Sequence, residues 1–230
     1  MLILVNIENN IKTIEIFIPK KEKIIMKIDQ TNQIIEYKNN NIISTGNNFL
    51  RNNKKLCKIE MNNIVEIGNN FLYYNKDLKD LYLPSLREVH SGFLRNNKIL
   101  QSLHLPKVKK IYNDVLSANL NLENLELMQV EEIGDHFLKN NFIISNIKLP
   151  KAKKIGSCFL YKNCHLKQVN FPCLEIVGDY FLECNTSIIE AHFPMLINVG
   201  RDFMCENKEL TTLDLPNISE IPHGFLYYSY

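Results

Sequence analysis

The sequence predicts a solenoid, a fold in which each short stretch of chain makes one turn that stacks on the next. An aromatic position recurs every 22 residues, and such a period is typical of stacked repeats. Each unit also carries an L-x-L segment, whose alternation indicates a short strand, and most units follow it with proline. The recurring positions are Phe49, Phe71, Phe93, Val115, Phe137, Phe159, Phe181, Phe203 and Phe225.

The other elements of the unit follow from their residues in order. We expect Leu103 and Leu105 to lie on one strand with both side chains buried. Pro106 is expected to end that strand, because proline has no backbone N–H to donate. The F-L pair then fills the far side of the core. A glycine before that pair is expected to adopt a positive φ at a corner, since glycine tolerates that conformation. The recurring glycines are Gly46, Gly68, Gly134, Gly156, Gly178 and Gly200.

An asparagine stands four residues after the aromatic position in every complete unit, and Ser229 replaces it in the last one. Its amide both donates and accepts hydrogen bonds, so we expect these side chains to form a ladder along the solenoid. A plain turn-forming role is the alternative. The predicted ladder consists of Asn53, Asn75, Asn97, Asn119, Asn141, Asn163, Asn185 and Asn207.

The L-x-x-L-x-L-P-S-L segment at Leu78 to Leu86 and the I-G-x-x-F-L segment at Ile67 to Leu72 resemble the leucine-rich repeat superfamily. More narrowly, they resemble its Treponema-type, or BspA-like, class over about residues 45–230. The resemblance implies an α/β leucine-rich-repeat solenoid. It would be right-handed, with a parallel sheet on one face and short 3-10, helical or extended segments on the other. That class commonly carries cysteine where this chain has the asparagine of the ladder.

The two ends depart from the repeat. Residues 27–48 read as a degraded copy, and we predict that residues 1–44 form an N-terminal cap. Residues 45–230 are then one continuous domain of repeats. The chain stops just after Phe225 and Leu226, so we expect the tyrosines at Tyr227 to Tyr230 to close the last turn. Alternatively, this edge is a docking site that permits self-association. A truncated chain would look the same.

Composition excludes several classes of partner. The 230 residues carry a net charge of +2 and are 45% hydrophobic, which favours a soluble folded protein without a general affinity for nucleic acid or acidic membranes. The first residues make a poor secretory signal, so we predict a cytoplasmic location. A chain exported without a cleaved leader would look the same. The six cysteines show no close pair, which favours free thiols and no metal or cofactor.

Outward strand residues are the candidate binding site. Stacked strands bring equivalent residues of neighbouring turns to about 4.8 Å, so each outward position forms a column along the surface. These columns are polar and varied where the buried columns are uniform, as a recognition surface requires. The candidate residues are Asp80, Tyr82, His104, Glu126, Lys148, Asn170, His192 and Asp214.

Two histidines within these columns raise an enzymatic alternative. His104 is predicted to neighbour Glu126, and His192 to neighbour Asp214. A histidine beside a carboxylate can be a general base or half of a metal site. An open sheet offers no pocket that excludes water, so we interpret both as solvated pairs. Bands of lysine and glutamate alternate along the stack, which suits either a striped partner or simple solvation.

The sequence therefore predicts a non-enzymatic module that binds a partner protein through its strand face. The resemblance implies either a surface-binding role in a bacterium or protist or an intracellular interaction module. A pathogen effector or a surface adhesin that engages a host protein is a narrower alternative. A His/Glu-dependent or metal-dependent enzyme on the strand face is the rival class.

Overall fold

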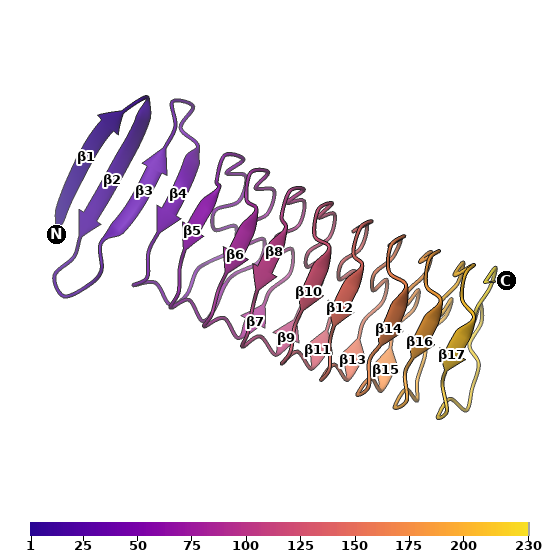
Figure 1. Ribbon diagram of the computed structural model, residues 1–230. Helices are drawn as coiled ribbons and strands as arrows, with labels where there is room; N and C mark the ends of the chain where they lie inside the picture. Colours follow the sequence, from indigo (N-terminus) through magenta and orange to yellow (C-terminus); the bar gives the residue numbers. More distant parts are fainter. Residues whose placement is uncertain (230) are drawn as a thin grey trace.

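The computed structural model describes residues 1–229, which form one elongated stack of strands and turns (Figure 1). An antiparallel meander stands at the N-terminal end, and the regular coil extends from it to the C-terminus. The meander consists of β1 (Leu2–Glu8), β2 (Ile11–Phe17), β3 (Ile24–Ile28) and β4 (Ile34–Lys38). From β4 onward the pairing is parallel: β4 pairs with β5, and Glu36 lies opposite Lys58, 22 residues further on.

The coil repeats one three-residue strand in every turn. Successive strands pair in register with equivalent residues, such as Leu81 with Leu103 and Leu125 with Ile147. We call the outward side of these strands the strand face. The strands are β5 (Lys58–Glu60), β6 (Asp80–Tyr82), β8 (Ser102–His104), β10 (Asn124–Glu126), β12 (Asn146–Lys148), β14 (Gln168–Asn170), β16 (Glu190–His192) and β17 (Thr212–Asp214).

A second parallel sheet runs along another side of the same turns. Its two-residue strands pair in the order β15-β13-β11-β9-β7, so it spans five consecutive turns. We call this the second sheet. Its strands are β7 (Glu88–Val89), β9 (Lys110–Ile111), β11 (Glu132–Ile133), β13 (Lys154–Ile155) and β15 (Ile176–Val177).

The expected α/β class is wrong, because residues 1–229 contain no helix and the fold is a β-solenoid. The third side of each turn is a run of turns in which every second residue has a positive φ, as at Leu94 (53°) and Asn96 (62°). A right-handed helix excludes such residues. Many backbone N–H groups here donate to neighbouring turns, as from Leu94 to the Phe71 carbonyl at 3.1 Å. Others donate three residues back, as from Arg95 to Gly92, but among the described residues none follows the four-residue pattern of a helix.

The recurring aromatic position forms the expected buried frame. The rings of Phe71 and Phe93 stack at a centroid distance of 5.9 Å, and those of Phe181 and Phe203 at 5.6 Å. Both pairs are fully buried. Val115 interrupts the stack of rings without exposing the core, because it is itself fully buried.

The expected positive φ at the recurring glycines is also wrong. Within residues 1–229, only Gly92 and Gly224 have a positive φ among glycines, and neither belongs to the recurring set. At Gly68 a Cβ atom would lie 2.4 Å from the backbone nitrogen of Asn47 in the preceding turn. At Gly46 a Cβ would meet nothing within 4 Å. Glycine recurs because successive turns approach closely there, and not because the corner needs its backbone freedom.

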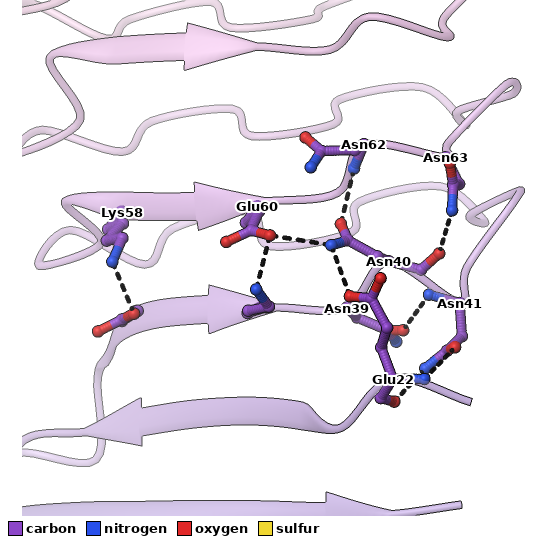
Figure 2. Close-up of polar contacts among 10 residues, drawn as sticks. Glu22, Asn39, Asn40, Asn41, Lys58, Glu60, Asn62 and Asn63 are labelled. Atoms are coloured by element: carbon purple, nitrogen blue, oxygen red, sulfur yellow. Dashed lines mark hydrogen bonds and ion pairs between the residues drawn. The ribbon is translucent and has the colours of Figure 1, made fainter. Parts of the chain in front are cut away.

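A polar network joins the meander to the coil (Figure 2). The amide nitrogen of the buried Asn40 donates to Glu22 at 3.0 Å and to Glu60 at 2.9 Å, while its Oδ1 accepts from the backbone N–H of Asn62. The Lys38 ammonium lies 2.7 Å from the Glu60 carboxylate. That hydrogen bond, followed by the one from Asn40, lowers the pKa of Glu60. The proposed domain boundary near residue 44 stays a prediction.

Candidate functional site

All eight candidate residues lie on the strands of the strand face. Because side chains alternate along a strand, their neighbours in the strand point inward. The central residue is buried in β6 to β16 of this face, as at Leu81, Leu103 and Leu125, and half-buried in the outermost strands β5 and β17, while the flanking residues face solvent. Tyr82 keeps 55% of its surface exposed. His192 is half-buried, and the other candidates are exposed. The face is therefore a row of accessible side chains on a fixed backbone.

Strands β6 to β12 of the strand face carry an aromatic pair and an ion pair. The rings of Tyr82 and His104 meet edge to face with centroids 6.4 Å apart. The Lys148 ammonium contacts the Glu126 carboxylate at 2.5 Å. Among the described residues, no hydrogen bond or ion pair joins His104 to Glu126. The Glu126 carboxylate pairs with Lys148 of the next turn toward the C-terminus. The contact that His104 makes on this face is the ring contact with Tyr82.

The C-terminal half of the strand face brings the second histidine to its carboxylate. His192 Nδ1 lies 3.9 Å from Asp214 Oδ2, beyond hydrogen-bond distance, and both side chains are substantially exposed. In the adjoining column, Gln168 donates to the Glu190 carboxylate at 3.0 Å. Over residues 1–229, no group of three or more His, Cys, Asp or Glu side chains is arranged to hold a metal ion.

A shallow hollow of about 390 Å³ interrupts the middle of the strand face. Lys148, Gln168 and Asn170 line it with polar atoms, and Pro150 and Met128 contribute apolar surface. Met128 is 46% exposed and occupies the position at which most units carry proline. Sequence reasoning overlooked this residue, although its departure from the repeat was visible. The hollow offers a place for a small apolar group flanked by amides and an ammonium.

The alternating charge bands also meet as opposite charges on the second sheet. Its register places Glu88, Lys110, Glu132 and Lys154 in one column. Lys110 lies 2.9 Å from Glu132, and this hydrogen bond raises the pKa of Lys110 and lowers that of Glu132. A column in which opposite charges already alternate suits solvation better than recognition of a single-sign partner.

The asparagine column lies on the turn side and is buried from Asn75 to Asn207. In Asn119, Nδ2 donates to the carbonyl of Leu94 at 2.9 Å, and the backbone N–H donates to Asn141 Oδ1 at 3.1 Å. Ser229 makes equivalent contacts, because its hydroxyl donates to Met204 O and accepts from the Asn207 N–H. Asn53 differs, since it is half-exposed and its amide donates only within its own turn, to Arg51.

A second polar column, not predicted from sequence, runs beside the recurring glycines. Asn113 accepts from the backbone N–H of Asp135 at 2.9 Å, and Asp135 accepts from that of Ser157 at 2.8 Å. Ser157 and Asp179 continue the series toward Arg201. The residue at this position varies among Asn, Asp and Ser. The sequence therefore does not repeat one residue type here, as it does at the asparagine position.

All six cysteines are free thiols, and Cys158, Cys184 and Cys205 lie on the turn side. Burial, followed by the nearby Glu206 carboxylate, raises the pKa of Cys184 to about 11. Burial also raises the pKa of Cys158 and of Cys205. These thiols are therefore weak nucleophiles at neutral pH.

Comparison with known proteins identifies the same type of repeat. The family described as the BspA type leucine rich repeat region matches residues 2–123 and 109–230 with six copies. The chain belongs to this family. No curated protein matches. A leucine-rich cell surface protein from Faecalibacterium prausnitzii is similar in structure, with 10% identity and a TM-score of 0.48, over 96% of this chain and 79% of that one. No helix in residues 1–229 is long and apolar enough to cross a membrane.

Proposed function

We propose that this BspA-type repeat protein binds a partner protein through its strand face and catalyses no reaction itself. The observation that carries the proposal is the contrast between columns. Buried positions stay apolar and the laddered position stays asparagine from turn to turn, whereas the last residue of each three-residue strand changes at every turn, from Tyr82 through His104 to Glu126. A rigid frame with varied exposed side chains is how repeat proteins present extended binding surfaces.

Aromatic and cationic groups give the strand face suitable anchors. Tyr82 and His104 form a rigid exposed pair, and Lys148 borders the hollow that includes Met128. Aromatic residues and methionine are enriched in the central parts of protein interfaces.

The adhesin and effector alternatives name particular partners for this same surface. The cytoplasmic location and export without a cleaved leader likewise remain proposals, as does self-association through the C-terminal edge.

The experiment compares two triple variants matched in residue type. Tyr82→Ala/His104→Ala/Lys148→Ala removes strand-face groups. Tyr112→Ala/His90→Ala/Lys110→Ala removes the same three residue types beside the second sheet, where the His90 and Tyr112 rings also stack, at 4.8 Å. We expect quantitative affinity capture from the native host or its target cells to lose its specific partner only with the first variant. Equal capture by both variants would rule out the strand face as the main binding site.

A further inference from the structure

The first strand of the meander is an unprotected sheet edge. Among the described residues, β1 pairs only with β2, in antiparallel register, so its other side presents unpaired backbone groups. Every residue of β1 is exposed. The exposed fraction is 56% for Leu2, 54% for Val5 and 68% for Ile7. Seven residues make it one of the two longest strands of the molecule, where the coil strands have three.

Devices that normally block such an edge are missing from β1. Leu2 to Ile7 contain no proline, lysine or other charge, and the register with β2 is continuous, without a bulge. The only charged side chain is that of Glu8, at the end of the strand. Natural edge strands usually carry at least one of these features, which prevent pairing with another chain.

The meander also has one apolar face that is covered only in part, from the half-buried Tyr37 to the exposed Val5. Val5, Ile14, Met26 and Tyr37 lie opposite one another in successive strands and therefore share a face. Tyr37 contacts the Phe49 ring at 5.6 Å, so this face continues the inner side of the coil. In the coil, each turn covers that side with its own remaining residues. Figure 1 shows no returning chain behind β1 to β3.

We propose that β1 pairs antiparallel with β1 of a second copy, which joins the two meanders into one sheet across a twofold axis near Val5. In this register Val5 faces Val5, and Ile3 faces Ile7, so apolar side chains meet on the inner face. The two Glu8 carboxylates lie at opposite ends, roughly 20 Å apart at the rise of a strand. A parallel pair would place the two carboxylates side by side. Charge therefore selects the antiparallel arrangement, which is the closed, isologous one.

The first test measures mass against concentration. A single strand pair is small for a stable interface, so we expect sedimentation velocity of the full chain to show a monomer–dimer equilibrium that shifts with concentration. Val5→Lys should abolish the dimer. Ile221→Lys, at a residue 73% exposed near the C-terminus, should leave it unchanged. Circular dichroism confirms folding of each variant. A wild type that stays monomeric, or loss of the dimer with Ile221→Lys alone, would overturn the proposal; the latter would assign the interface to the C-terminal edge.

The second test reads the register. In a background with the exposed Cys57, Cys164 and Cys173 changed to serine, Val5→Cys places two thiols across the axis. Diamide, which is reduced to the hydrazine as it takes two electrons and two protons from the thiols, should then give a covalent dimer. Ile7→Cys should give at least tenfold less, because Ile7 faces Ile3. Equal yields from both variants would indicate a different arrangement of the chains and overturn the antiparallel register.

Discussion

The meander and the coil are both built of β-strands, yet they depend on different contacts. The coil uses strands of two or three residues, each repeated one turn away, and covers its inner face with its own chain. The meander uses strands of five to seven residues and leaves β1 exposed on both faces. Its outer face is crossed by ion pairs such as Lys27–Glu36 at 2.6 Å. Repetition, and not strand length, is therefore what creates a closed core in this molecule.

The largest expected effect breaks the ladder of the coil. Asn119→Ala should lower the free energy of unfolding by about 3 kcal/mol, because the buried Leu94 carbonyl loses its donor and a small cavity remains. Asn53→Ala is the matched control at the edge of the coil. It should cost less than about 0.5 kcal/mol, since its amide makes one weak bond within its own turn. Urea denaturation measures both values, and equal losses would contradict a structural role specific to stacked turns.

The next effect tests the close approach between turns. Gly68→Ala should destabilise the protein by about 2 kcal/mol, because the added Cβ would overlap the backbone of Asn47 and Gly46. Gly46→Ala, one turn earlier, meets open space and should leave the melting temperature unchanged or slightly raised. Differential scanning fluorimetry of the two variants checks the pair. A larger loss at Gly46 would show that backbone conformation, and not contact, selects glycine here.

The smallest effects are opposite responses to pH. Lys38 and Asn40 lower the pKa of Glu60 from its ordinary 4.5, so its contribution is present above pH 4.5 and is lost as pH falls through the lowered value. Burial, followed by the Asp202 and Glu206 carboxylates, raises the pKa of Glu183 above 4.5. Its ionisation therefore destabilises the folded protein above the raised pKa, and the free energy of unfolding increases as pH falls from there toward 4.5.

We therefore expect Glu60→Gln to destabilise and Glu183→Gln to stabilise the protein at pH 7. Each change should be below about 1 kcal/mol because both groups are partly exposed to solvent. Denaturation measured from pH 7 downward tests this, since each difference should shrink as the wild-type carboxyl becomes protonated, at a higher pH for Glu183 than for Glu60. Changes of the same sign at pH 7 would contradict the assigned causes.

Sequence reasoning located the coil well because its constraints recur every 22 residues. Strand register, the buried aromatic column and the outward residues followed directly from that period. The helical segments were wrong because the conformation of residues such as Leu94 depends on hydrogen bonds from neighbouring turns, which no local pattern encodes. The antiparallel meander has no period at all. The pairing of Glu126 with Lys148, and not with His104, depends on side-chain conformations that the spacing along the chain does not determine.

The most direct test of strand-face binding is carboxyl footprinting of the captured complex. Carbodiimide-coupled labelling, read by mass spectrometry, reports the accessibility of individual Asp and Glu side chains. We predict that Asp80, Glu126 and Asp214 lose labelling when the partner binds, while Glu88 and Glu132 on the second sheet label as in the free protein. Protection confined to Glu88 and Glu132, with the strand face still labelled, would contradict the account.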